Sequence, residues 1–587
     1  MAPQLALKVY DNGDHTALAW LPDPATPIAD CRGFLIRKRR NGHDALLHGS
    51  VSFEDGATFD AAKPWLFPLQ RYMWWDYYVE PGDMVQYSVV PVVGPDKDHL
   101  GLADGLASPY TPPMTVDSQT TPNLTAYFNK GIVAAQWVSK ALSAQPAGSK
   151  LADLVATPGN ELRNKLAGLL LPEMLRLLAE TRAKGGKIFA ALYELNDPEL
   201  IAALTQFGAD CSLILANGAK TPDENEKVRK DLRTGTQIQV FDRLVSSSHF
   251  AHNKFLVFCD PAGLPERVFT GSTNWTSSGL CTQANNGLLI NDPAIAADFL
   301  DAWKRLKAAG NAYPPALVSG NDSATGHNVD GSTVTPWFVK TSAAQDLTYA
   351  RGLINGAKDG ILFLFFNPGR YQKDPAKRTL LQDIRDRSRD ASSPHFDPSL
   401  YVRGVVNQQI DQLTVDDIAA AAADPAASAA AADPAAATSA PKPVALYEGA
   451  KPAQHLSHEV LVPGNIKAQF HDWEKELLGA SMVNVHSKVV VLDPFGAKPV
   501  VMTGSHNLGY KASHANDDNL VIIEGNAPLA AAYAINIIAI FQTYRWNHYV
   551  ELHRQDPKAW HGPQDSDTWQ SGHLAGDALR ELQFWMS

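Results

Sequence analysis

Two hydrophobic patterns divide the chain. Residues 1 to about 115 hold short runs that alternate apolar and polar positions, such as "TALAWLP" and "VQYSVVPVVG", separated by Gly, Pro and Asp. Alternation with a period of two is typical of strands that bury one face, so this part predicts a small β-sandwich. Further along, continuous apolar runs alternate with helical stretches, as in "KIFAALYEL" (187–195) and "DPELIAALTQFG", a predicted helix that ends at Gly208. This second pattern predicts an α/β fold with a mixed sheet covered on both faces.

The same strand pattern returns in the second half, in "GILFLFFNPGR" (360–370) and "LYVRGVVNQ" (400–408). Between them and the next motif lies an Ala/Pro-rich stretch in which proline interrupts an otherwise helix-favouring composition, and we interpret it as a surface insert rather than a lid. The predicted organisation is a β-sandwich at 1–115, one lobe at 125–310, a second lobe at 336–555 with an insert at 412–447, and a C-terminal tail at 556–587.

Composition limits the number of domains, the kinds of ligand and the location that we expect, but it does not predict a function. The chain has 587 residues, too many for one hydrophobic core, and a net charge of -11, which gives no general attraction to polyanions. Its four cysteines lack CxxC spacing, so neither a zinc site nor a disulfide framework is expected. The start lacks a basic and an apolar signal region, and the apolar run "APLAAAYAINIIAIF" is shorter than the roughly 20 residues that span a bilayer. We therefore expect a cytoplasmic protein with a buried late helix.

An internal repeat carries the chemistry. "AHNKFLVFCD" (251–260) and "VHSKVVVLD" (485–493) each place a histidine and a lysine two positions apart, hence on one face of a strand. Each is followed by a matching element, "TGSTNWTSSG" from Thr270 and "TGSHNLGYKA" from Thr503. From the histidine to the Gly-Ser pair is 19 positions in the first copy and 18 in the second, and one extra residue before Asp260 accounts for the offset. Two matched copies make chance occurrence improbable.

These residue types suit phosphodiester cleavage. Imidazole can act as nucleophile or as general acid near neutral pH, and a phosphoryl group needs positive charge and N–H donors around its oxygens. No cluster with metal-ligand spacing is evident, so side chains must supply that charge and no metal or other cofactor is expected. The candidate catalytic residues are His252, His486, Lys254, Lys488, Asn274 and Asn507, with Ser272 and Ser505 as candidate phosphate-binding residues.

The repeat resembles the phospholipase D superfamily, whose members carry HxKxxxxD twice, each followed by a G-S/G-x-N element. The resemblance implies two α/β lobes related by a pseudo-two-fold axis, with both His–Lys strands meeting at their interface. It also implies that Asp518 supports His252 from the opposite lobe, which makes His252 the nucleophile and His486 the acid/base, with Asn285 behind His486. The reverse assignment stays open. Asp260 and Asp493 are expected to end strands and fix turns.

The resemblance predicts the reaction more firmly than the substrate. A phospholipase D acting through a phosphohistidine, able to hydrolyse phospholipids and to transfer the phosphatidyl group, is the first hypothesis. A metal-independent nuclease is the second, and a binding or scaffold protein that uses the N-terminal module is the third. That module resembles a fibronectin type III domain. Expected partners are a phospholipid or another phosphodiester, with nucleic acid as the alternative, and the expected form is a monomer that contacts membrane surfaces transiently.

Overall fold

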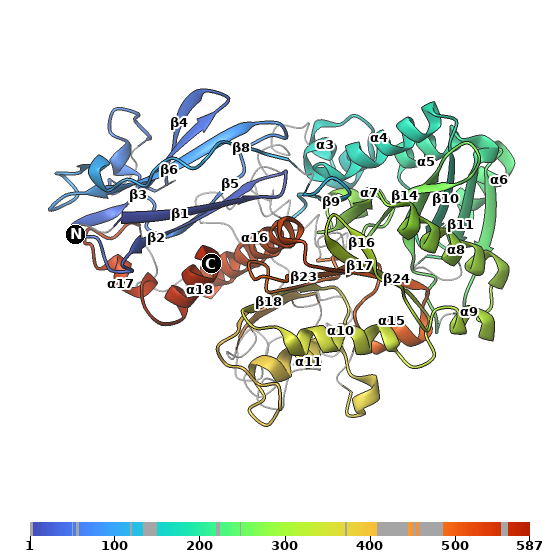
Figure 1. The fold of residues 1–587 in the computed structure, drawn as a ribbon. Coiled ribbons are helices and arrows are strands. Elements are labelled where there is room, and N and C mark those ends of the chain that lie inside the picture. Colours follow the sequence, from blue (N-terminus) through green and yellow to red (C-terminus); the bar gives the residue numbers. More distant parts are fainter. Residues whose placement is uncertain are drawn as a thin grey trace, which may run out of the picture. The chain divides into compact units, whose positions relative to one another are not determined.

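The structure is a computed structural model with side chains, drawn in Figure 1. It groups the chain into two compact units, residues 1–118 with 552–587, and residues 119–551. The residues that it describes are 4–49, 51–54, 58–117, 120–132, 149–218, 223–246, 248–369, 372–407, 444–449, 454–456, 485–552 and 562–587.

The first unit contains two antiparallel sheets. One has the strand order β1-β2-β5 and the other the order β4-β3-β6-β7, with β8 pairing to β6. The C-terminal residues predicted as a tail group with this unit: the Gln570 amide oxygen accepts hydrogen bonds from the Tyr72 hydroxyl and the Ile28 N–H, both at 2.9 Å. The elements are β1 (Gln4–Asp11), β2 (Thr16–Asp23), β3 (Cys31–Arg40), β4 (His43–Leu47), β5 (Met73–Asp76), β6 (Met84–Val93), β7 (Gly101–Leu102), β8 (Met114–Thr115), α17 (Trp569–His573) and α18 (Gly576–Met586).

The second unit holds the predicted α/β region, and its first sheet has the order β12-β11-β10-β13-β14-β15-β9. Helix α5 (Pro198–Thr205) begins where Asp197 caps it by accepting from the Leu200 N–H, and it ends three residues before the predicted Gly208. The strands are β9 (Leu124–Phe128), β10 (Lys187–Leu192), β11 (Cys211–Ala216), β12 (Gln239–Arg243), β13 (Lys254–Cys259), β14 (Pro265–Gly271) and β15 (Asn286–Ile290), and the longest helices are α4 (Leu170–Ala183) and α8 (Pro293–Ala309). We call β9 to α8 the first lobe.

The second sheet has the order β16-β17-β24-β23-β22-β18-β19-β20-β21. Six of its strands, β19-β18-β22-β23-β24-β17, repeat the order and the strand directions of β11-β10-β13-β14-β15-β9. The pseudo-two-fold axis itself stays a prediction. The strands are β16 (His327–Val329), β17 (Ser332–Val339), β18 (Gly360–Phe365), β19 (Tyr401–Val406), β20 (Val444–Glu448), β21 (Gln454–Leu456), β22 (Val489–Leu492), β23 (Val500–Gly504) and β24 (Asp518–Glu524).

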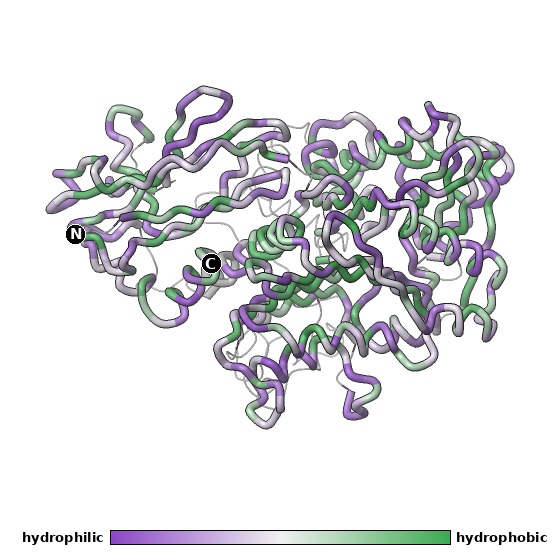
Figure 2. Tube along the Cα trace, in the orientation of Figure 1, coloured by the Kyte–Doolittle hydropathy of each residue, from purple (hydrophilic) through white to green (hydrophobic). Residues whose placement is uncertain are grey.

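We call β16 to α16 (Ala527–Leu552) the second lobe. The predicted insert ended at residue 447, but β20 occupies its last residues because Val444 to Tyr447 are buried in the sheet; residues 412–443 lie outside the described ranges. Helix α16 is long and apolar enough to cross a membrane, yet 72% of its apolar window is buried inside the structure. Its Tyr533 hydroxyl accepts a hydrogen bond of 2.9 Å from the Asn286 amide of the first lobe. Figure 2 shows the hydrophobic colouring of α16, which we interpret as the predicted buried helix.

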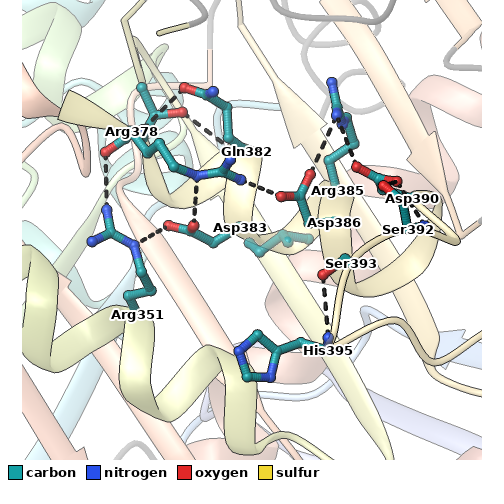
Figure 3. A network of polar contacts seen from close by, with 12 residues as sticks. Arg351, Arg378, Gln382, Asp383, Arg385, Asp386, Asp390, Ser392, Ser393 and His395 are labelled. Carbon is teal, nitrogen blue, oxygen red and sulfur yellow. Dashed lines mark hydrogen bonds and ion pairs between the residues drawn. The ribbon is translucent and has the colours of Figure 1, made fainter. Parts of the chain in front are cut away.

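A chain of ion pairs joins α10 (Gln345–Gly356) to α11 (Leu380–Ser388) in the second lobe (Figure 3). The Asp383 carboxylate, 5% exposed, accepts from the Arg351 Nε at 2.9 Å and from the Arg378 Nε at 3.2 Å. Arg378 also pairs with Asp386, and Arg385 donates to Asp386 at 3.2 Å. Because one buried carboxylate neutralises two guanidinium groups, Asp383 connects the two helices more strongly than a surface pair would.

Asp383→Asn should therefore destabilise the protein. Losing the charge removes the carboxylate partner of Arg351 and leaves Arg378 with Asp386 alone, and we expect the free energy of unfolding to fall by about 2–3 kcal/mol. Urea denaturation followed by circular dichroism measures this change. The matched control is Asp231→Asn, which breaks the exposed Lys227–Asp231 pair and should leave the unfolding midpoint almost unchanged. Equal shifts for both variants would contradict a special role for Asp383.

Candidate active site

Both His–Lys pairs lie where the two lobes are joined by short parallel β-bridges. One bridge pairs Ala251 with Asp517, and the other pairs Ala284 with Val485. The His252 N–H donates to the Asp517 carbonyl at 2.8 Å, and the His486 N–H donates to the Ala284 carbonyl at 3.0 Å. The backbone of each histidine is thus held by the opposite lobe.

The side chain of His252 is also supported across the interface. Its Nδ1 lies 2.8 Å from Asp518 Oδ1, and Asp518 accepts further hydrogen bonds from the Ser505 hydroxyl at 2.7 Å and the Asn516 amide at 3.2 Å. Since a carboxylate only accepts, Nδ1 carries the proton and Nε2 keeps its lone pair. His252 is 5% exposed and Asp518 is fully buried. This is the cross-lobe contact that the resemblance implied.

His486 has the same arrangement with an amide in place of the carboxylate. Its Nδ1 lies 2.9 Å from Asn285 Oδ1, and Asn285 accepts from the Ser272 hydroxyl at 2.7 Å. The Asn285 Nδ2 donates to the Gly279 carbonyl at 2.8 Å, which fixes the amide with its oxygen toward His486. His486 therefore also has its proton on Nδ1, but its supporting residue is neutral.

Ser272 and Ser505 lie behind the residues that support the two histidines. Each hydroxyl donates to the residue that supports a histidine and accepts from a backbone N–H, that of Asn286 for Ser272 and that of Asn519 for Ser505, both at 3.0 Å. Both serines are fully buried. Their hydroxyl groups therefore orient Asn285 and Asp518, and a phosphate-binding role for the two serines stays a prediction.

Each lysine lies against an aromatic ring that the sequence analysis missed. The Lys254 ammonium donates to the His252 carbonyl at 2.8 Å and lies 4.9 Å from the Tyr193 ring centroid. The Lys488 ammonium donates to the His486 carbonyl and lies 4.6 Å from the Phe366 centroid. Tyr193 and Phe366 contact the histidines edge-on as well, with centroids 4.7 and 4.5 Å apart. Each ring directly follows the strand that pairs with the His–Lys strand, and this shared position was the available signal.

Burial of these groups changes their proton affinities. Burial and the charge of Lys254 lower the pKa of His252 to about 4, while Asp518 opposes the shift. Burial and the charge of Lys488 hold the pKa of His486 well below its usual value. Burial also lowers the pKa of Lys254 to about 7, against the opposing charges of Asp518 and Glu194. Burial thus destabilises positive charge on these side chains, and a phosphate anion bound beside them would raise all three pKa values.

The two predicted amide donors are not equivalent. The Asn274 Nδ2 donates to Glu194 Oε2 at 2.7 Å, so one of its two N–H groups is engaged, and its Oδ1 has no hydrogen-bond partner among the described residues. Asn507 is half-buried, and no described residue pairs with its Oδ1 either. Glu194 follows Tyr193 directly, whereas Asn367 follows Phe366, so the first lobe adds a carboxylate that the second lobe lacks.

Asp260 and Asp493 fix turns, as expected for them. Asp260 Oδ1 accepts from the Leu264 N–H at 2.8 Å. Asp493 accepts from the backbone N–H groups of Lys358, Asp359 and Gly360, at 2.7 to 3.1 Å. Their hydrogen bonds stabilise the backbone at the strand ends. Within the described ranges, no three His, Cys, Asp or Glu side chains come close enough together to hold a metal ion.

A buried ion pair lies beside Asp518, the residue that supports His252. Arg243 donates to both carboxylate oxygens of Asp517, from Nε at 2.7 Å and from Nη2 at 3.0 Å, and each side chain is 1% exposed. Arg243 also donates to the Ala312 carbonyl at 2.7 Å and stacks on the Tyr313 ring. Asp517 directly precedes Asp518, whereas Ala284 holds the same place before Asn285. The His252 half of the site, which Asp518 supports, therefore has this buried ion pair, and the His486 half has an alanine in the place of Asp517.

Arg243→Met should cost about 3–5 kcal/mol of unfolding free energy, because it leaves the Asp517 carboxylate buried without a counter-charge. Arg243→Met combined with Asp517→Ala should cost less than Arg243→Met alone, since the other repeat tolerates alanine at this position. Urea denaturation of the two single variants and the double variant gives the coupling free energy. Additive losses would contradict a direct interaction between the two charges.

Comparison with known proteins places part of this site in a family. Residues 176–307, which include His252, Lys254 and Asn274, match the family described as "Cardiolipin synthase, PLD-like domain". They therefore form a PLD-like domain. No curated protein sequence is similar enough to this chain to count as a relative.

Several solved structures are similar to the chain at low identity. Phosphatidylserine synthase from Haemophilus influenzae is 12% identical, with a TM-score of 0.39, over 70% of this chain and 90% of that one. The phospholipase D family member Nuc from Salmonella typhimurium is 19% identical, with a TM-score of 0.20, over 24% and 89%. Polyphosphate kinase from Porphyromonas gingivalis is 12% identical, with a TM-score of 0.33, over 59% and 42%, so the alignment spans less than half of that kinase.

Proposed function

We propose that the protein is a phosphodiesterase that works through a covalent phosphohistidine on His252. The observation that carries this proposal is the pair of buried histidines whose Nδ1 atoms are each supported from the opposite lobe and which are each accompanied by a buried lysine. The PLD-like domain at 176–307 agrees with a phosphoryl-transfer enzyme.

In the first step, the Nε2 lone pair of His252 attacks phosphorus and the bond from phosphorus to the leaving oxygen breaks. The imidazolium of His486 donates the Nε2 proton to that oxygen, so the leaving group departs as an alcohol. Asp518 stabilises the positive charge that develops on His252, which the neutral Asn285 cannot do for His486. This asymmetry supports His252 as the nucleophile in the proposed mechanism.

In the second step, neutral His486 takes a proton from water, and the resulting hydroxide attacks phosphorus and breaks the P–N bond. An alcohol in place of water gives a new diester, so the same site would perform transphosphatidylation. Lys254 and Lys488 would hold the nonbridging oxygens in both steps.

Phospholipids and nucleic acids both present the bond that this chemistry cleaves, and the sequence analysis placed phospholipase D first. A lipid substrate calls for an apolar rim around the site. Among the described residues of the second unit, three large hydrophobic side chains are exposed: Leu244, Leu264 and Tyr349. The geometry thus supports the phosphodiesterase chemistry more directly than a lipid substrate.

Trapping the intermediate tests the assignment of the nucleophile. His486→Ala should still form a phosphoenzyme, because attack by His252 does not need His486 when the leaving group is a good one such as p-nitrophenolate. His252→Ala should form none. Phosphorus-31 NMR or mass spectrometry of acid-quenched enzyme after reaction with bis(p-nitrophenyl) phosphate detects the adduct. The opposite pattern would assign the nucleophile to His486.

Activity should persist in EDTA, because Lys254 and Lys488 are placed to supply the positive charge that a divalent ion supplies in other phosphodiesterases. The measurement is release of p-nitrophenol from bis(p-nitrophenyl) phosphate, and of phosphatidylethanol from mixed phospholipid vesicles with ethanol, with His252→Ala as the control. Activity that EDTA removes and a metal restores would contradict this mechanism. Phosphatidylethanol that disappears with His252→Ala would identify a phospholipase D.

A further inference from the structure

A cationic surface lies next to the strand that carries His252. Both lobes and their connection contribute to it. Lys511 and His514 are exposed, while Lys340 and His249 are half-buried. We call these four side chains the cationic patch.

Aromatic rings lie against residues of the cationic patch. The Lys511 ammonium lies 4.6 Å from the Phe250 centroid, and the Lys340 ammonium lies 5.7 Å from the Tyr313 centroid. His249 lies against Tyr313, with ring centroids 4.7 Å apart, and its Nδ1 donates to the Ala515 carbonyl at 2.5 Å. The patch is therefore a supported surface and not a set of unrelated side chains.

Among the described residues, no carboxylate forms an ion pair with the cationic patch. Lys340 and Lys511 differ in this from Lys184 and Lys227 of the same unit, which pair with Glu180 and Asp231. Burial together with the charges of Lys340, Lys377 and His249 lowers the pKa of His514, so the two lysines supply most of the positive charge. In a chain of net charge -11, two neighbouring lysines without an acidic partner in the described ranges favour an anionic ligand.

The patch is continuous with the active site. Phe250 stands two residues before His252, its carbonyl accepts from the Asp517 N–H at 2.8 Å, and its ring lies 6.2 Å from that of Tyr193. Tyr193 in turn contacts His252 and Lys254. A ligand held on the patch therefore lies beside the residues that surround His252.

We infer that the cationic patch binds phosphates that flank the scissile one in a single-stranded nucleic acid. A phospholipid with one phosphodiester would use that group in the catalytic site, whereas phosphates repeat along a nucleic acid strand. His252 and His486 are only 5% and 4% exposed, which favours a thin, flexible single strand over a rigid duplex. Cleavage of the strand rests on the proposed phosphodiesterase function, whereas binding of the strand to the patch does not.

Binding of a fluorescent oligothymidine to full-length His252→Asn protein, followed by anisotropy at several salt concentrations, tests this inference without turnover. Lys340→Gln/Lys511→Gln added to that protein should raise Kd about 10-fold or more. It should also reduce the slope of log K against log salt by about 0.7 for each lost phosphate contact. Lys340→Arg/Lys511→Arg should keep most of the affinity, because it keeps the charge.

The matched control is Lys184→Gln/Lys227→Gln, which removes the same charge from two exposed lysines that are paired with Glu180 and Asp231. It should leave Kd and slope near those of the parent. Equal losses in the control, or no oligothymidine binding by the parent, would overturn the inference. So would binding of the patch to phosphatidylglycerol vesicles in preference to the oligonucleotide. Failure of the parent enzyme to cleave bis(p-nitrophenyl) phosphate would instead count against the proposed function.

Discussion

The hydrogen bonds from each histidine to the opposite lobe are the constraint on which the rest of the site depends. An imidazole on a strand end has no fixed orientation by itself, and here Asp518 and Asn285 supply it from 2.8 and 2.9 Å away. Each supporting residue accepts a hydrogen bond from a serine hydroxyl, and that hydroxyl accepts one from a backbone N–H at the start of a strand. The orientation of each imidazole therefore depends on the sheet of the opposite lobe. Neither lobe has a complete catalytic group alone, because each provides one imidazole and the acceptor for the other.

The second constraint is electrostatic. Two lysines and two histidines are buried together, and one fully buried carboxylate, Asp518, compensates them with help from the half-buried Glu194. Burial, together with this shortage of negative charge, explains why the pKa values of the lysines and histidines are lowered. A phosphodiester anion removes that shortage, so the site favours binding of its substrate and the protonated form of His486 at the same time.

The repeat predicted the histidines, lysines, amides and Asp518 because chemistry that needs two equivalent halves leaves matched spacings in the sequence. It could not predict what the serines do, since the direction of a hydroxyl hydrogen bond depends on neighbours that only the fold brings together. Tyr193 and Phe366 were missed because aromatic residues at strand ends look like ordinary core residues. Glu194 and the Arg243–Asp517 pair were missed for a different reason: each occurs in one repeat only, so comparison of the copies does not reveal it.

Among the features of the sequence, net charge gave the least information about which ligands the site attracts. An excess of eleven negative charges argues against nonspecific attraction to polyanions, but it describes the whole surface and not the approach to the site. Lys340, Lys511, His249 and His514 come from three segments that are far apart in the sequence, so no basic run marks them. The fold brings them together beside Phe250, while lysines elsewhere, such as Lys184 and Lys227, are neutralised by acidic neighbours. In an acidic protein, a cationic patch beside the active site concentrates anionic ligands there more selectively than a uniformly basic surface would, because the excess of negative charge elsewhere repels them.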